Sequence, residues 1–236
     1  MKRSKLCLGL LIVLALAMTV LPLSSCSLLN GESSMTELVQ GNLDSVYLGK
    51  VTPEYLKLVD STKEECQANY LEGLEFEADY FAYYWGILAE DEQLSDLSEQ
   101  LQQRIIDLYK AIYARAKYTV QKASLQDDYY TVKVVVEPID IMVQATELGD
   151  SGSYEPLEQY YRKANAKDWS VMSETEYWQL TEEYGSIIVE MVESLLPDLG
   201  YGESRSQILQ VEQVDGYWQV NSDDFAVLDT YIITYP

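Results

Sequence analysis

Two long amphipathic stretches constrain the fold of this chain more than any other feature. From Lys63 to Ile87, apolar side chains recur every three or four residues, and acidic residues occupy the opposite side. This spacing is typical of an α-helix that buries one face. A second helix with the same periodicity is predicted from about Ser95 to Arg115. The apolar face of the first helix consists of Cys66, Tyr70, Leu74, Ala78, Phe81, Trp85 and Leu88.

The residues that follow change to a period of two, which is typical of β-strands. Tyr118–Gln126 and Tyr129–Glu137 are predicted to form a hairpin around the turn Asp127-Asp128. A two-residue turn at this point predicts two opposed pairs, Leu125 with Tyr130 and Ala123 with Val132.

A second hairpin is predicted near the end of the chain, over Ser204–Val220. Its turn is Asp215-Gly216, a pair that favours the type I′ conformation. With this register, one face of the hairpin carries Leu209, Val211, Trp218 and Val220.

Shorter helices are predicted from their capping residues. Ser34 with Glu37, and Ser173 with Glu176, have the spacing of a capping box, and Ser222 can cap a last helix. The segment from Gly149 to Ser153 is expected to be a loop. The helices expected from these signals cover Met35–Leu48, Pro53–Val59, Glu155–Ala164, the segment after Ser173 up to Pro197, and Asp223–Thr230.

This order of elements predicts an α+β fold. An antiparallel sheet of two hairpins, with about four strands, would pack against several amphipathic helices, because no βαβ alternation is present. We expect residues 1–25 to be a signal peptide, 26–34 a tether, and 35–236 a single α+β domain, helical in its N-terminal half.

The N-terminus predicts secretion and a lipid anchor. Basic residues precede an apolar run from Leu6 to Leu21, which is short for a membrane span. The following Leu23-Ser24-Ser25-Cys26 resembles the lipobox of bacterial lipoproteins. The resemblance implies cleavage before Cys26 and acylation of its thiol, which would hold the protein on the outer face of the cell membrane. An ordinary signal peptide and an uncleaved anchor helix remain alternatives.

The charge and the missing residue types exclude several functions. Residues 1–25 contain three basic and no acidic residues, so from Cys26 onward 13 basic residues stand against 39 acidic ones, a formal charge of −26. We therefore exclude nucleic acid and anionic lipid as partners. The chain has no histidine, which excludes histidine-ligated zinc and histidine-dependent triads. If Cys26 is acylated, Cys66 has no cysteine partner for an intramolecular disulfide, and its apolar face predicts a buried thiol.

The C-terminal segment carries a family resemblance. Asp215-Gly216-Tyr217-Trp218-Gln219-Val220, followed by Asp223-Asp224-Phe225, resembles the ending of many small Gram-positive lipoproteins of unknown function. The stretch from Tyr130 to Pro138 looks like their central strand. The resemblance implies the cone-shaped fold of nuclear transport factor two and the cystatins, in which a curved sheet and helices enclose a pocket. It implies no catalytic residues.

Tyrosine is the most informative residue type for function. The chain has 20 tyrosines but only three phenylalanines, and tyrosine suits a half-exposed binding surface, although ordinary packing would also use it. Glu77 lies at the edge of the apolar face and is a candidate functional carboxylate, or the partner of Arg104, Arg115 or Lys117. The candidate ligand-binding residues are therefore Glu77, Tyr84, Trp85, Tyr130 and Trp218.

We expect a non-catalytic lipoprotein that binds a ligand or a protein outside the membrane. No catalytic residue, metal site or cofactor is expected, although the oxygen-rich loop from Gly149 to Ser153 leaves Ca²⁺ open. Two alternatives remain. One is a hydrolase of cell-wall glycan or peptide that uses carboxylates, and the other is a structural subunit of a surface complex.

Overall fold

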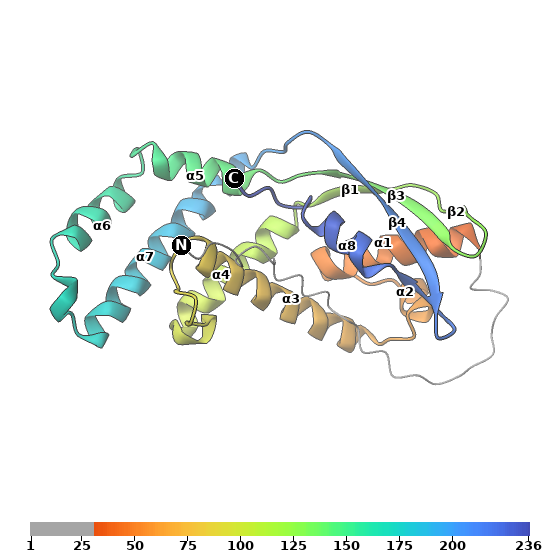
Figure 1. Ribbon diagram of the computed structural model, residues 1–236, viewed down its shortest axis with the longest axis horizontal. Coiled ribbons are helices and arrows are strands. Elements are labelled where there is room, and N and C mark those ends of the chain that lie inside the picture. The colour runs from red at the N-terminus through yellow and green to blue at the C-terminus, as the bar shows by residue number, and fades with distance from the viewer. Residues whose placement is uncertain (1–30) are drawn as a thin grey trace, which may run out of the picture. The chain divides into compact units, whose positions relative to one another are not determined.

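The computed structural model describes residues 31–236, and these group into two compact units (Figure 1). Unit 1 holds the described residues up to Asn69, together with Tyr118–Val136 and Arg205–Tyr231. Unit 2 holds Tyr70–Lys117, Glu137–Ser204 and Ile232–Pro236. The predicted signal peptide and Cys26 lie outside the described residues, and the expectation of one domain over 35–236 stays a prediction.

Unit 1 is built on a curled antiparallel sheet with the strand order β1-β3-β4-β5, and the short strand β2 also pairs with β3. Helices accompany this sheet, so the predicted α+β class is confirmed. The strands are β1 (Lys117–Val120), β2 (Ser124–Leu125), β3 (Tyr130–Glu137), β4 (Arg205–Val214) and β5 (Tyr217–Val220).

Both predicted hairpins form. Leu125 pairs with Tyr130 as expected, but residues 121–123 leave the strand, so the first hairpin is split into β1 and β2 and Ala123 has no ladder position. In the second hairpin Val214 pairs with Tyr217. Asp215 and Gly216 have φ values of +51° and +90°, the left-handed conformation that a type I′ turn requires at both positions.

The helices of unit 1 are α1 (Glu32–Leu48), α2 (Pro53–Leu58) and α8 (Ser222–Asp229). The predicted capping box at Ser34 is wrong, because α1 begins at Glu32, directly after Gly31, and takes up the end of the expected tether. Helix α8 lies along β4 (Figure 1). Its cap is Asn221 and not Ser222: the Asn221 side-chain oxygen accepts hydrogen bonds from the backbone N–H groups of Asp223 and Asp224, both at 3.1 Å.

Unit 2 is helical. Helix α3 (Lys63–Tyr84) begins in unit 1 and continues into unit 2, where α7 contacts α4, α5 and α6. The capping box of Ser173 and Glu176 is confirmed at the start of α7. The other helices are α4 (Glu99–Tyr113), α5 (Ile141–Asp150), α6 (Glu155–Asn165) and α7 (Glu174–Leu195), with short 3₁₀ turns η1 (Leu94–Asp96), η2 (Trp169–Val171) and η3 (Leu196–Asp198).

Three features of unit 2 differ from expectation. Helix α3 ends at Tyr84, before Ile87, because Gly86 adopts the left-handed φ of +64° that stops a helix. Helix α4 begins after its cap at Ser98, and Ser95 lies in η1. Helix α5 was not expected, and it takes in Gly149 and Asp150 of the predicted loop.

Within residues 31–236, no helix combines the length and the apolar character needed to cross a membrane. Each unit has an apolar core, with Val132 and Leu209 fully buried in unit 1 and Ile105 and Val189 fully buried in unit 2. Cys66 is buried in unit 1 as expected, with its Sγ atom 3.7 Å from the Ser61 hydroxyl oxygen.

Candidate functional site

A cluster of aromatic rings in unit 2 contains two of the predicted site residues. Tyr80 and Tyr84 lie one helical turn apart on α3, so their rings share a face. Tyr235, near the end of the chain, packs edge to face against both, with ring centroids 5.3 Å from Tyr80 and 4.8 Å from Tyr84. Trp85 meets Tyr84 at a centroid distance of 5.5 Å and an interplanar angle of 89°. Because the rings touch one another, a ligand would meet their outer faces.

The C-terminal segment is held in place by backbone hydrogen bonds to Ile139. The Ile139 N–H donates to the carbonyl of Ile232, and the Thr234 N–H donates to the carbonyl of Ile139. These bonds fix the position of Tyr235, which sequence periodicity could not place because the segment makes no helix or hairpin of its own.

Hydroxyl groups connect the cluster to helix α4. The hydroxyls of Tyr109 and Tyr235 are hydrogen-bonded, and the Tyr113 hydroxyl donates to Glu77 Oε1 at 2.6 Å. Burial is the main reason why the pKa values of Tyr109 and Tyr235 lie well above that of a free phenol, and the charge of Glu77 raises both further. Both phenols therefore remain protonated at neutral pH, and one donates a hydrogen bond to the other.

Glu77 was predicted as a functional carboxylate or as the partner of a nearby cation. The structure gives it the phenol of Tyr113, whereas each of the three proposed cations has another partner. Those partners are Glu193 for Arg104, the Leu196 carbonyl for Arg115, and Glu137 for Lys117.

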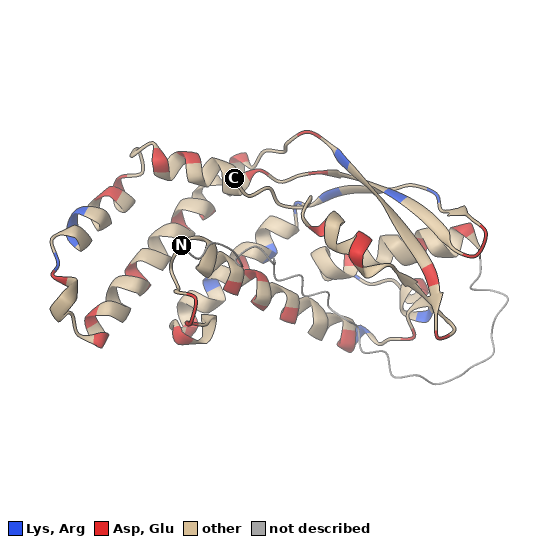
Figure 2. Ribbon diagram, in the orientation of Figure 1, with Lys and Arg blue, Asp and Glu red and all other residues tan. Residues whose placement is uncertain are grey.

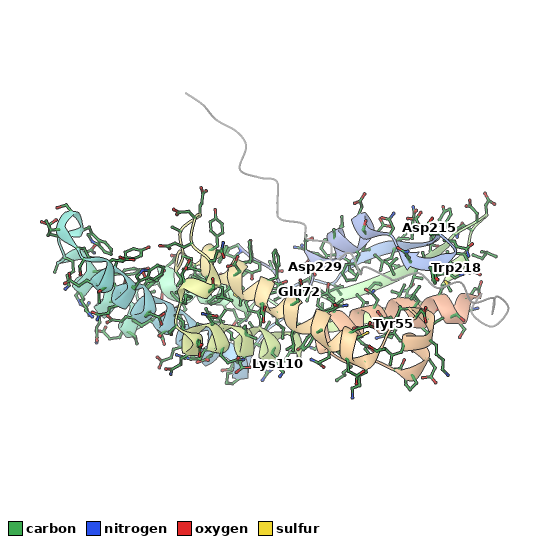
Figure 3. All side chains as sticks on the ribbon, turned by 90° about the horizontal axis from the view of Figure 1, so that it is seen from below. Tyr55, Glu72, Lys110, Asp215, Trp218 and Asp229 are labelled. Atoms are coloured by element: carbon green, nitrogen blue, oxygen red, sulfur yellow. The ribbon has the colours of Figure 1, made fainter. Side chains whose placement is uncertain are left out.

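The outer side of α3 carries an acidic–aromatic stripe. Glu72, Phe76, Asp79 and Tyr83 follow one another at spacings of four, three and four residues, which places them along one line of the helix. Tyr83 is 46% exposed, and Glu72, labelled in Figure 3, is exposed as well. Acidic residues of α3 are visible along this helix in Figure 2. The stripe combines negative charge with open ring surface.

Trp85, which directly follows α3 and packs against Phe81 and Tyr84, carries a hydrogen-bond donor. Its indole Nε1 is buried and has no hydrogen-bond acceptor in the part of the chain that the structure describes. A buried donor without an acceptor costs about 1–3 kcal/mol, so an acceptor supplied from outside the chain would be stabilising.

The other two predicted site residues belong to unit 1. Tyr130 on β3 and Trp218 on β5 meet edge to face, with ring centroids 5.2 Å apart. Trp218 is labelled on the second hairpin in Figure 3. The five candidate residues thus divide between the two units, Tyr130 with Trp218 and Glu77 with Tyr84 and Trp85.

Unit 1 also contains carboxyl–phenol pairs that sequence reasoning missed. The Tyr47 hydroxyl donates to Asp229 at 2.7 Å, and the Tyr118 hydroxyl donates to Asp44 at 2.6 Å. Burial raises the pKa of Asp229, and the Tyr47 hydrogen bond opposes that rise. Tyr47 and Asp229 are 182 residues apart, so no local pattern could have paired them.

Among residues 31–236, no group of three or more aspartate, glutamate, cysteine or histidine side chains is arranged to hold a metal ion. In the oxygen-rich segment that left Ca²⁺ open, the Ser151 hydroxyl donates to the Leu148 carbonyl, and the Ser153 N–H donates to the Ser151 hydroxyl. Local hydrogen bonds at the end of α5 thus account for these groups.

The comparisons with known proteins give one structural similarity. No protein-family model and no curated protein matches the chain. Among solved structures, the fold is similar to that of ycdA from Bacillus subtilis, named a "putative lipoprotein", with a TM-score of 0.53 at 18% sequence identity. The match covers 86% of this chain and 58% of ycdA, so the chain spans little more than half of that protein. The similarity concerns the fold, and the relation to nuclear transport factor two and the cystatins stays a prediction.

Proposed function

We propose that this chain is a lipid-anchored, extracytoplasmic binding protein, without catalytic activity, that uses the acidic–aromatic stripe of α3 to bind a lysine- or arginine-rich segment of a partner. The observation that carries the binding proposal is the alternation of acidic and aromatic side chains along one line of the helix, where Glu72 and Tyr83 are exposed and Phe76 and Asp79 are half-buried.

The anchor is supported by the N-terminal sequence. An apolar run, small residues at Ser24 and Ser25, and then Cys26 give the order of a lipoprotein signal. The similarity in fold to ycdA, which is named a "putative lipoprotein", agrees with this assignment. Two acyl chains on Cys26 would hold the protein on the outer face of the cell membrane.

The basic partner is supported by the chemistry of the stripe. The exposed carboxylate of Glu72 attracts ammonium and guanidinium groups, and the exposed ring of Tyr83 can receive the same cations on its face. Asp79 adds negative charge between them, although its Oδ1 already accepts a hydrogen bond from the Leu94 N–H at 2.9 Å. The formal charge of −26 from Cys26 onward would also speed the approach of a basic partner. Such binding needs no reacting group, which agrees with the absence of histidine.

Mass spectrometry of the mature protein tests the anchor. We expect a chain that starts at Cys26 and carries two acyl groups, and a Cys26→Ser variant that is released from membranes. An unmodified Cys26 thiol, or a mature chain that retains residues 1–25, would contradict the anchor.

Fluorescence anisotropy with a short peptide of alternating lysine and glycine tests the stripe. The unacylated Cys26→Ser protein should bind this peptide and should not bind its glutamate counterpart, and the affinity should fall as salt is added. Tyr83→Ala should weaken binding about two- to fivefold, as expected for one exposed cation–π contact.

Tyr161→Ala is the matched control, since Tyr161 is also a tyrosine of unit 2 and is 41% exposed. Its replacement should leave the affinity unchanged. Equal losses in the two variants, or equal binding of the lysine and glutamate peptides, would refute the stripe as the binding surface.

A further inference from the structure

The connection between α6 and α7 presents two large apolar side chains to solvent. It forms the end of a helical hairpin in unit 2 (Figure 1) and contains the short turn η2. Trp169 is 51% exposed, and Val171 is 78% exposed. We call this segment, residues 166–173, the hairpin tip.

The hairpin tip is held in shape by hydrogen bonds at both ends. On one side, Asp168 Oδ1 accepts from the N–H and the hydroxyl of Ser170, at 3.1 and 2.7 Å. On the other side, Ser173 and Glu176 form the capping box of α7. The conformation that exposes Trp169 and Val171 is therefore built by the local sequence.

The space beneath the hairpin tip is already filled. A small core between the two helices contains the buried residues Tyr160, Ala164 and Leu180, and Met172 packs against it together with Tyr184 and Ile187. Met172 thus supplies the inward apolar contact, and its neighbour Val171 remains outside. Trp169 and Val171 precede this inward residue, and large apolar side chains exposed so close together favour burial against another surface.

The charge around the hairpin tip differs from that of the rest of the chain. The hairpin tip itself contains one basic residue, Lys167, and one acidic residue, Asp168, and carries no net charge, whereas the chain from Cys26 onward carries −26. Basic residues lie on α6 near the connection, as the blue segments of the ribbon in Figure 2 show. The ion pairs here are Arg162 with Glu155, Lys163 with Glu183, and Lys167 with Glu176.

We infer that the hairpin tip is a second, non-covalent contact with the membrane, in which Trp169 and Val171 enter the boundary between lipid headgroups and acyl chains. Tryptophan prefers this boundary because its ring is apolar and its N–H is polar. A region without net charge escapes the repulsion that the remaining acidic surface would meet at an anionic bilayer. The total charge of the chain opposes anionic lipid, whereas the hairpin tip carries no net charge.

The inference rests on the proposed function for its setting, because the Cys26 anchor would keep the hairpin tip at a high local concentration near a bilayer. The contact itself is a property of the hairpin tip. It can therefore be tested in a Cys26→Ser protein, which carries no acyl chains, so the result does not depend on whether Cys26 is acylated in the wild type.

Sedimentation with phosphatidylcholine vesicles is the first test. The Cys26→Ser protein should sediment with the vesicles, and the further change Val171→Asp should weaken the association at least fivefold. Ile208→Asp is the matched control, since Ile208 is 56% exposed on β4 in unit 1 and should not contribute. Vesicles that contain phosphatidylglycerol should bind no more tightly if the contact is apolar.

Quenching by brominated acyl chains locates the inserted residue. We expect the vesicles to quench part of the tryptophan fluorescence, and Trp169→Phe should remove that quenched part while vesicle binding largely persists. The inference is overturned if the protein does not sediment with vesicles, if Val171→Asp and Ile208→Asp behave alike, or if the quenching survives in Trp169→Phe. If the protein does not sediment with vesicles but binds the lysine peptide normally, the membrane contact is wrong and the proposed function stands. The exposed side chains of the hairpin tip would then be assigned to contact with a protein partner.

Discussion

At the scale of single residues, the contact between Gly41 and Tyr55 leaves no room for a side chain at position 41. Gly41 lies on α1, where a Cβ atom would overlap the Tyr55 ring and lie 2.7 Å from the Tyr55 Cβ. Tyr55 is only 2% exposed and cannot move aside into solvent. We predict that Gly41→Ala lowers the free energy of unfolding by about 1–3 kcal/mol, measured by urea denaturation.

Gly149→Ala is the control for this substitution. Gly149 also lies in a helix, but a Cβ there would first meet Leu157 at 3.6 Å, which is an ordinary contact. Alanine is a better helix former than glycine by about 0.8–1 kcal/mol. The free energy of unfolding should therefore stay the same or rise slightly, and a loss as large as that of Gly41→Ala would contradict the packing argument.

Residue-level predictions succeeded where the relevant neighbour is close in sequence. The burial of Cys66 follows from helical spacing, and the pairing of Leu125 with Tyr130 follows from the turn between them. Glu77 was placed correctly at the edge of the apolar face, but its phenol partner Tyr113 lies on another helix. A partner 36 residues away depends on how two helices pack, which their separate periodicities do not determine.

At the scale of elements, the end of α8 carries a buried carboxyl. Asp229 is the last residue of this helix, where a negative charge also opposes the helix dipole. Because burial raises the pKa of Asp229 above its unfolded value, its contribution to stability is complete below about pH 4 and is lost as the pH rises through the folded pKa. We predict that Asp229→Asn, which cannot ionise and still accepts from Tyr47, is more stable than the wild type at pH 7.

Thermal unfolding measured from pH 4 to pH 8 checks this prediction. The wild-type stability should fall relative to Asp229→Asn across that range. Asp215→Asn removes the same charge from the exposed turn of the second hairpin, where asparagine tolerates the left-handed backbone. Figure 3 labels both aspartates. A pH profile for Asp229→Asn that matches that of Asp215→Asn would disprove a special role for the buried carboxyl.

The capping signals show how far element boundaries can be predicted. The same serine–glutamate spacing begins α7 at Ser173 but fails at Ser34. Ser173 follows an extended residue with ψ near 134°, whereas Glu32 and Ser33 already continue the helix back to Gly31. Helix α5 was missed because it begins only four residues after β3 ends at Glu137, and its apolar residues are too few to show a clear period. A capping motif therefore predicts a helix start only where the preceding residues are extended.

At the scale of the whole molecule, the two units are interleaved along the chain. The chain passes from one unit to the other five times, and helix α3 contributes residues to both. The sequence predicted the α+β class because periodicity reports local structure. It did not predict this division, because the division depends on contacts between segments that are far apart in the chain.

Interleaved units predict that the protein unfolds in one cooperative transition. Neither unit is a continuous segment of the chain, and helix α3 and strands β1 and β3 have residues in both units. If one unit unfolds, the chain segments of the other unit lose the fixed ends that hold them in place, so we expect the two to unfold together. Trp218→Phe leaves the tryptophans of unit 2, Trp85, Trp169 and Trp178, as fluorescent probes. Urea midpoints from this fluorescence and from far-ultraviolet circular dichroism, measured on the same variant, should coincide.

The complementary variant replaces Trp85, Trp169 and Trp178 by phenylalanine and keeps Trp218 as the probe of unit 1. Its fluorescence midpoint should again equal its own circular dichroism midpoint, even if the replacements change the overall stability, because each comparison is made within one protein. Separate midpoints in either variant would mean that one unit survives the loss of the other. In that case the chain would consist of two folding domains, and the expectation of a single domain over 35–236 would be wrong.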